Sequence, residues 1–259
     1  MKEIRTLTPQ YKEAEELRIM ITGEDGGGKS SYINTIDSAL QGYVTSRALA
    51  SGGICSFTKK FKPFRVEDCA NGEGDGVLPF VIYDVMPIDK NVKSPDVFIS
   101  MAKGHIKDGY TFNPIKSISD DSPYFNKNPT VNDVAHCLVY LVAADYLNIM
   151  DDHVLRLITE IRSAVSDTEI SYASKSLPNI LLIVLIINDL GKAVSSKYYP
   201  EWFSHIFGIP VNCILPVKNY SEEISLNDDI DVLALTALLQ ILRFANGHLL
   251  NLTQMGYKK

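Results

Sequence analysis

A glycine-rich segment, GEDGGGKS at residues 23–30, constrains the fold of this chain more than any other feature of its sequence. It fits the pattern G-x-x-x-x-G-K-[ST]. A short apolar run at residues 17–22 precedes it, and residues 29–41 follow with apolar side chains at helical spacing up to Gly42. Because strand, glycine loop and helix in this order are typical of a phosphate-binding loop (P-loop), the segment predicts a nucleotide-binding α/β fold.

The residue types in this segment each suit a phosphate ligand. Glycines allow successive backbone N–H groups to point at one anion, and the start of the helix adds further unpaired N–H groups. The Lys29 ammonium would reach the β and γ phosphates, and the Ser30 hydroxyl would ligate Mg²⁺. We therefore predict that the nucleotide contacts Asp25, Gly26, Gly27, Gly28, Lys29, Ser30 and Ser31. A glycine turn that binds no ligand is the alternative.

Beyond the P-loop, apolar strands alternate with amphipathic helices. Strands are expected at residues 77–85, 135–143, 179–187 and 213–217, and helices at 153–165, 192–207 (in part) and 229–250. This alternation predicts a three-layer domain with a mainly parallel sheet. Residues 57–66 and 77–85 form a predicted hairpin, and Pro63 makes its first arm an antiparallel edge strand because proline cannot donate a ladder hydrogen bond.

The remaining segments carry weaker patterns. We expect residues 1–16 to be a lead-in with a helix at 9–16, and residues 17–259 to form one G-domain-like P-loop domain. Residues 86–132 are rich in Pro, Asn, Ser, Asp and Gly, with one short helix expected at 96–106. Long loops of this kind usually carry function or move.

The net charge of −6 argues against nucleic acid or an anionic membrane surface as the main partner. The longest apolar run, residues 180–187, is too short for a membrane span, which needs about 18 residues. We therefore expect a cytoplasmic protein without a membrane span. The four cysteines lie far apart, which favours free, mostly buried thiols over a zinc site or a redox pair.

A second metal-holding group is expected at Asp84, where the strand at residues 80–83 ends. A carboxylate at this position would hold the magnesium through water, although an acid that merely ends a strand is the alternative. Thr45, Ser56 and Thr58 are candidates for a third ligand, and we name Thr58 as the predicted one. Arg47 lies in the same stretch and is interpreted as an exposed loop arginine rather than a catalytic one.

Three further motifs point to a known family: YDVM at residues 83–86, GYTFNPI at 109–115 and PVKNYS at 216–221. With them, the chain resembles the interferon-induced protein 44 family from about residue 17 to residue 250. The resemblance implies a cytosolic GTPase-like domain that binds GTP or GDP with Mg²⁺ and is associated with innate immune or antiviral responses.

The chain also departs from the usual GTPase pattern. Pro87 stands where a glycine N–H normally contacts the γ-phosphate, and proline has no N–H. The base-reading motif [NT]-K-x-D keeps only Asp189, so guanine selection would depend on that residue, which could equally be a plain loop acid. Lys218 is a candidate contact over the base, although a solvated surface lysine is the favoured interpretation. Glu24 and Asp25 would repel a γ-phosphate by about 1 kcal/mol. No residue that orients the attacking water is identified, so the catalytic residues stay unknown and hydrolysis should be slow.

Three hypotheses follow. The leading one is a protein that binds a guanine nucleotide weakly and presents its loops to an unidentified protein partner. The second is a GTPase that turns over once a homodimer supplies the missing groups. The third is a nucleotide-free pseudo-GTPase scaffold in which the glycine loop is a relic.

Overall fold

The computed structural model describes residues 1–50, 60–68, 76–113, 116–145, 150–166, 180–187 and 198–254. Its centre is a six-stranded sheet with the order β2-β5-β1-β6-β7-β8, and a two-stranded ribbon pairs β3 with β4. The strand bounds are β1 Leu17–Gly23, β2 Pro63–Phe64, β3 Glu67–Asp68, β4 Gly76–Val77, β5 Phe80–Asp84, β6 Cys137–Ala143, β7 Ile180–Ile186 and β8 Ile214–Val217.

Five strands of the main sheet, β5, β1, β6, β7 and β8, run parallel to one another. The sixth, β2, pairs antiparallel with β5 at the edge of the sheet, with Pro63 opposite Tyr83. These pairings confirm the predicted fold class, including the proline-bearing edge strand. Because parallel strands are covered on both faces, they read as continuous apolar runs such as LVYLV in β6.

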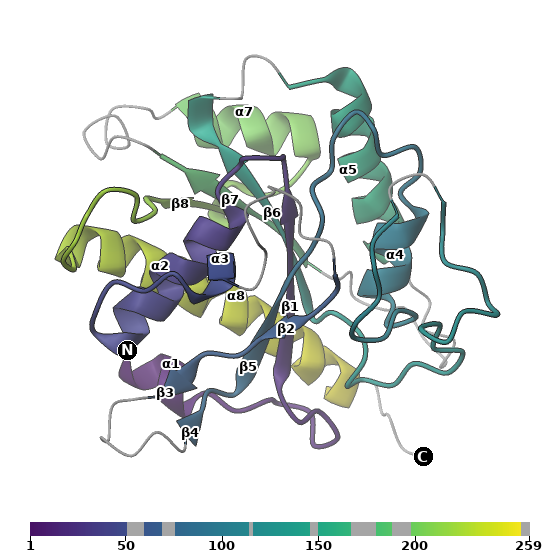
Figure 1. The fold of residues 1–259 in the computed structure, drawn as a ribbon, viewed down its shortest axis with the longest axis horizontal. Helices are drawn as coiled ribbons and strands as arrows, with labels where there is room; N and C mark the ends of the chain where they lie inside the picture. The colour runs from purple at the N-terminus through teal and green to yellow at the C-terminus, as the bar shows by residue number, and fades with distance from the viewer. Residues whose placement is uncertain are drawn as a thin grey trace.

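Helices cover both faces of the sheet (Figure 1). One face packs against α1 (Lys2–Thr6), α2 (Lys29–Gln41) and α8 (Asp228–Gln254), and the other against α4 (Asp96–Ala102), α5 (Asp152–Ser166) and α7 (Tyr198–Phe207). Successive strand residues alternate between the two apolar clusters: Val139 packs with α2 and α8, whereas Tyr140 packs with α5 and α7. Two short helices lie in connections along the chain: α3 (Arg47–Ala50) between α2 and β2, and η2 (Val211–Cys213) between α7 and β8.

Local signals set the ends of the two longest helices on the α2 face. Helix α2 lies between Gly28 and Gly42, both in the left-handed region, and the Gly42 N–H donates to the Ser38 carbonyl at 3.0 Å. Helix α8 begins after Asn227, whose Oδ1 accepts the N–H groups of Asp229 and Ile230 at 3.0 and 3.2 Å. Each end therefore follows from a residue visible in the sequence.

Helix α8 is also long and apolar enough, by length and composition alone, to cross a membrane. In this structure one side of it packs against α2 and the sheet, with Ile230, Ala234, Leu238 and Leu242 all buried. The absence of a membrane span therefore stays a prediction. Both described cysteines, Cys137 and Cys213, are free and buried, as expected.

Two local expectations are wrong. Residues 9–16 are not helical, and the lead-in helix is instead α1 at Lys2–Thr6. The backbone here bonds to a side chain of α8 instead of to itself: Gln10 N–H donates to Asn246 Oδ1 at 2.7 Å, and Asn246 Nδ2 donates to the Thr8 carbonyl at 2.9 Å. The helix expected at 96–106 ends at Ala102, because Gly104 adopts a left-handed conformation.

Candidate nucleotide site

The glycine loop lies between β1 and α2, at the edge of the sheet where the parallel strands end. Gly23, the last residue of β1, pairs with Leu141 of β6. A Cβ atom on Gly23 would lie 2.0 Å from the Leu141 carbonyl oxygen, so only glycine fits there. Ligands of open α/β sheets bind at this edge, and the fold thus places the loop where a ligand can reach it.

The loop folds back on itself before α2 begins. Gly27 N–H donates to the Glu24 carbonyl at 3.1 Å, and Gly28 caps the helix with a φ angle of +89°. Asp25 and Gly26 are exposed at the tip of this turn, whereas Gly27 is buried. The predicted phosphate-contacting residues therefore form one compact turn, with Ser31 half-buried in the first turn of α2.

Lys29 is turned into this loop, with 8% of its surface exposed. Its Nζ donates to the Glu24 carbonyl at 2.8 Å and lies 3.5 Å from the Gly23 carbonyl. Burial lowers the pKa of the ammonium, and the negative charges of Asp84, Asp25 and Glu24 counteract that shift. The lysine is thus held by two carbonyls of its own loop, which use two of the three N–H donors of its ammonium group.

Ser30 and Asp84 come together at the other end of the loop, although 54 positions separate them in sequence. The Ser30 hydroxyl donates to Asp84 Oδ2 at 2.8 Å. Hydroxyl and carboxylate oxygens are ligands that Mg²⁺ accepts, usually one or two from protein with phosphate oxygens and waters completing the shell. The described residues contain no group of three His, Cys, Asp or Glu suited to a metal, so these two oxygens fit magnesium only beside a phosphate.

The four residues after Asp84, which we call the β5 extension (residues 85–88), are all buried. Val85 N–H donates to the Ile21 carbonyl and Ile88 N–H donates to the Gly23 carbonyl, each at 2.9 Å. The Thr22 hydroxyl donates to the Met86 carbonyl at 3.0 Å. The extension is therefore fixed to β1, and the Ile88 N–H next to Pro87 is not available to a phosphate.

Glu24 departs from the expectation that it faces the γ-phosphate. Its Oε2 atom is buried and has no hydrogen-bond partner. Burial raises the pKa of its carboxyl, against the opposing effect of Lys29, and the Glu24 charge in turn helps burial to raise the pKa of Tyr140. Because the side chain points inward toward β6, Asp25 is the acid left at the exposed tip of the loop.

The loop after β8, residues 218–227, is the third part of the site, and we call it the β8 loop. Lys218 Nζ donates to Glu223 Oε1 at 2.9 Å, and this contact together with the Ser221 N–H lowers the pKa of Glu223 to about 2. The next residue, Asn219, turns the other way: its Nδ2 donates to the Gly28 carbonyl at 3.0 Å. The role of Lys218 over a base stays a prediction.

Other predicted residues lie elsewhere. The Thr45 N–H donates to Ser38 Oγ at 2.9 Å, and Ser38 is about 12 Å along α2 from Ser30, so Thr45 is too far to share its metal ion. Arg47 is not an exposed loop residue, because it forms two hydrogen bonds with the buried Asp37 at 2.7 and 2.8 Å. Ser56, Thr58 and Asp189 lie outside the described residues.

Sequence reasoning missed Asn219 as a site residue, although it lies inside the PVKNYS motif. The only signal available was its position directly after a strand that ends at the same edge of the sheet as β1. A contact between residues 191 positions apart, with Gly28 as the partner, has no local pattern.

Three relatives with curated names match nearly the whole chain. Interferon-induced protein 44-like from Homo sapiens is 28% identical over 256 residues, and interferon-induced protein 44 from Homo sapiens is 27% identical over 257, each covering 96% of this chain. Interferon-induced protein 44 from Mus musculus is 27% identical over 252 residues. The chain spans just over half the length of these relatives, 56% to 58%.

No protein-family model matches the chain. Among solved structures, the G-domain of FeoB from Methanococcus jannaschii covers 88% of this chain and 98% of its own, at 16% identity and a TM-score of 0.39. The fold assignment rests on the strand order and the P-loop rather than on this loose match. The three relatives confirm the resemblance stated from the motifs: the chain is similar to the interferon-induced protein 44 family over 96% of its length.

Proposed function

We propose that this chain binds a guanine nucleotide, GDP or GTP, together with Mg²⁺ at the P-loop, and hydrolyses it slowly or not at all. The observation that carries the proposal is the 2.8 Å contact between Ser30 Oγ and Asp84 Oδ2 beside the glycine turn. Two oxygens that suit magnesium thus lie next to a row of backbone N–H groups that suits a diphosphate.

The residues of the site would divide the work as follows. The N–H groups of Gly26 and of residues 28–30 would bind the phosphate oxygens, and the Gly27 N–H, like Lys29, would have to exchange the Glu24 carbonyl for a phosphate. Ser30 would bind the metal directly and Asp84 through water. Bound Mg²⁺ would neutralise part of the phosphate charge. Asp189, Lys218 and Thr58 keep their predicted roles at the base and the metal.

The wider role is proposed from the relatives. Their names tie them to interferon induction, which supports an innate immune or antiviral function for this chain. Its cytoplasmic location is proposed from the sequence alone. The β5 extension offers only apolar, buried side chains after Asp84, none of which would orient an attacking water. We therefore infer that the protein acts by binding, through an unidentified protein partner, more than by turnover.

One observation favours a second candidate function, a scaffold that holds no nucleotide. The Lys29 ammonium already has two carbonyl neighbours within its own loop, at 2.8 and 3.5 Å. A lysine satisfied in this way weakens the gain from binding a phosphate, since one set of hydrogen bonds replaces another.

Calorimetric titration of the full chain with GDP, GTP and ATP in the presence of Mg²⁺ tests the proposal. We expect binding of GDP and GTP, weaker binding of ATP, and loss of binding in Lys29→Ala. The matched control is Lys93→Ala, an exposed lysine of the segment between β5 and β6. If no nucleotide binds and millimolar GDP with Mg²⁺ leaves the unfolding temperature unchanged, the scaffold function replaces the proposal.

Turnover needs a separate measurement. Phosphate release that rises more steeply than protein concentration, and that disappears in Ser30→Ala, would support a GTPase completed by a homodimer. We expect instead a rate close to the uncatalysed baseline at every concentration.

A further inference from the structure

We propose that Asn219 is a nucleoside-positioning residue: its Nδ2 fastens the β8 loop to the P-loop, and its Oδ1 accepts an N–H group from the purine base of the bound nucleotide. This inference rests on the proposed nucleotide site and deepens it. Its structural basis has three parts: an acceptor without a partner, its place relative to the phosphates, and the rigidity of the loop that carries it.

The first part is the state of the side chain. Asn219 is 9% exposed, and its Oδ1 atom is covered and has no hydrogen-bond partner. The amide orientation is fixed, because the Gly28 carbonyl can only accept and must face Nδ2. A buried acceptor without a partner destabilises a fold by about 1–3 kcal/mol, so such atoms usually mark a site that a ligand or water completes.

The second part is position. A magnesium ion bound beside the phosphates would be held by Ser30 and Asp84, which lie on the β5 side of the P-loop. The nucleoside must therefore leave the loop on the opposite side, toward β6, β7 and β8. Gly28 lies on that side, since a Cβ atom there would be 2.8 Å from Asn219 Nδ2 and 3.6 Å from Ile186 Cγ1 of β7.

The third part is the rigidity of the β8 loop. Tyr220 N–H donates to Thr35 Oγ1 of α2 at 3.0 Å, and the Tyr220 hydroxyl donates to Asp231 Oδ1 of α8 at 2.6 Å. Within the same loop, Lys218 also forms an ion pair with Glu223. The asparagine between these contacts is thus held in place before a ligand arrives, and preorganised groups bind with a smaller loss of conformational entropy.

The chemistry required of the ligand is an N–H donor at the edge of its base. Guanine offers N1–H and the 2-amino group, and adenine offers the 6-amino group. Pyrophosphate supplies the same two linked phosphates with no base. The ratio of the dissociation constants of pyrophosphate and GDP, both with Mg²⁺, therefore isolates the contribution of the nucleoside from that of the phosphates.

The experiment measures this ratio by calorimetry for the full chain, Asn219→Ala, Asn219→Asp and the control Asn128→Ala, whose side chain is exposed and remote from the P-loop. We expect the ratio to fall about tenfold in Asn219→Ala, the size expected for one hydrogen bond to the base. In Asn219→Asp the acceptor remains, so the ratio should stay within about threefold even if both ligands bind more weakly.

The outcomes separate the two proposals. An unchanged ratio in Asn219→Ala overturns the base contact, and an equal weakening of both ligands shows that Asn219 only braces the P-loop. The base contact is also overturned if the ratio falls as far in Asn219→Asp as in Asn219→Ala. If Asn219→Ala does not fold, the ratio measured for Asn219→Asp decides the matter. Should the wild type bind neither ligand, the proposed function itself fails, and the inference falls with it. If the wild type binds GDP and the base contact holds, repeating the measurement with ADP identifies which N–H group of the base Asn219 Oδ1 accepts.

Discussion

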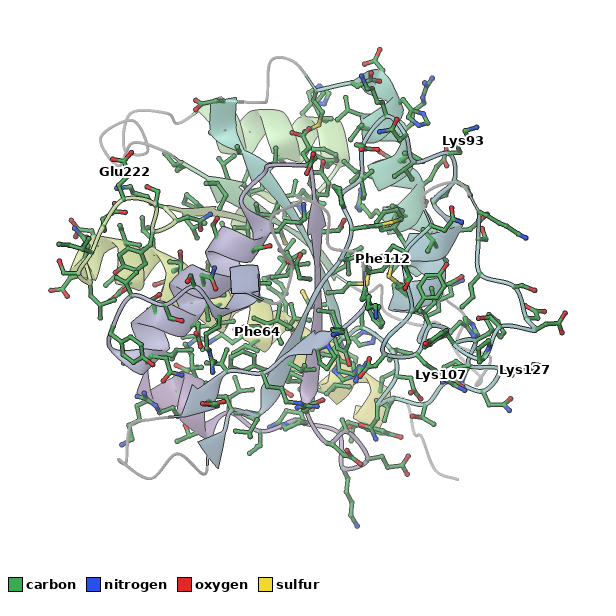
Figure 2. All side chains as sticks on the ribbon, in the orientation of Figure 1. Phe64, Lys93, Lys107, Phe112, Lys127 and Glu222 are labelled. Atoms are coloured by element: carbon green, nitrogen blue, oxygen red, sulfur yellow. The ribbon has the colours of Figure 1, made fainter. Side chains whose placement is uncertain are left out.

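The two segments that flank the P-loop differ in polarity and in how they are held. On one flank the β5 extension is apolar, buried and hydrogen-bonded to β1, from Val85 N–H at Ile21 to Ile88 N–H at Gly23. On the other flank the β8 loop is polar and carries ion pairs and side-chain hydrogen bonds, such as Lys218 with Glu223. Figure 2 places Glu222 of the β8 loop on one side of the molecule, and Lys93 and Lys107 of the segment after β5 on the other.

This difference teaches where the domain is able to respond to a ligand. A phosphate sensor must exchange its hydrogen bonds when the third phosphate is present, and the N–H groups of Val85 and Ile88 are already bound to carbonyls of β1. The β8 loop, in contrast, offers a fixed polar surface with an acceptor still to be satisfied. The site therefore suits holding a nucleotide better than sensing its hydrolysis.

The largest expected effect tests the rigid flank. Ile88 is 1% exposed, so Ile88→Ala should lower the free energy of unfolding by about 2–5 kcal/mol, the range for removing a buried aliphatic side chain. The matched control is Ile224→Ala in the β8 loop, where isoleucine is 98% exposed and the change should stay within about 0.5 kcal/mol. Urea denaturation measures both, and similar values for the two variants would remove the contrast between the flanks.

The next effect concerns the polar flank. Tyr220→Phe removes the hydroxyl that donates to Asp231 and accepts the Asn227 N–H at 2.8 Å. The expected loss is about 1.5 kcal/mol in the free energy of unfolding, because a hydrogen bond to a charged group is involved. Tyr43→Phe, at an exposed tyrosine, serves as the control and should change little. If Tyr220→Phe is equally neutral, the β8 loop is not braced as the structure indicates.

Glu24, in the P-loop between the two flanks, should make the stability of the fold depend on pH. Because burial raises the pKa of Glu24 in the folded state, its contribution to stability is fully present below the ordinary pKa of 4.5 and is lost as pH rises through the raised value. Glu24→Gln should therefore match the wild type near pH 4 and exceed it at pH 7, by no more than about 1 kcal/mol because the half-exposed carboxyl is partly screened by solvent. Thermal unfolding between pH 4 and pH 8 checks this, and a difference that shrinks toward pH 7 would contradict the inward orientation of Glu24.

Much of this arrangement was predictable because its signals are local. The bounds of α2 follow from Gly28 and Gly42, and the mainly parallel sheet follows from buried apolar runs that alternate with amphipathic helices. The P-loop itself is a continuous segment whose residue types state its chemistry. Even the meeting of Ser30 with Asp84 could be anticipated, since each residue lies at the end of a parallel strand or just beyond it.

The rest depends on contacts that no local pattern encodes. Arg47 looked like an exposed loop residue until the structure brought it to the buried Asp37 of α2. Glu24 was expected to face the γ-phosphate, because sequence does not tell which way a loop side chain turns. Asn219 contacts Gly28 only because β8 and β1 end at the same edge of the sheet, with β6 and β7 between them.

The smallest expected effect is the sharpest test of the comparison between the flanks. If the β5 extension is fixed to β1 with and without ligand, a third phosphate gains no new N–H contact there, since Pro87 has none and Ile88 N–H is bound to the Gly23 carbonyl at 2.9 Å. The remaining effects of the γ-phosphate, attraction to Lys29 and magnesium against repulsion from Asp25, then partly cancel. We expect dissociation constants for GDP and a non-hydrolysable GTP analogue within about threefold of each other, which is less than 1 kcal/mol. A preference of a hundredfold for the triphosphate would mean that the extension leaves β1 when GTP binds, because the Ile88 N–H would then be released from the Gly23 carbonyl to contact the third phosphate.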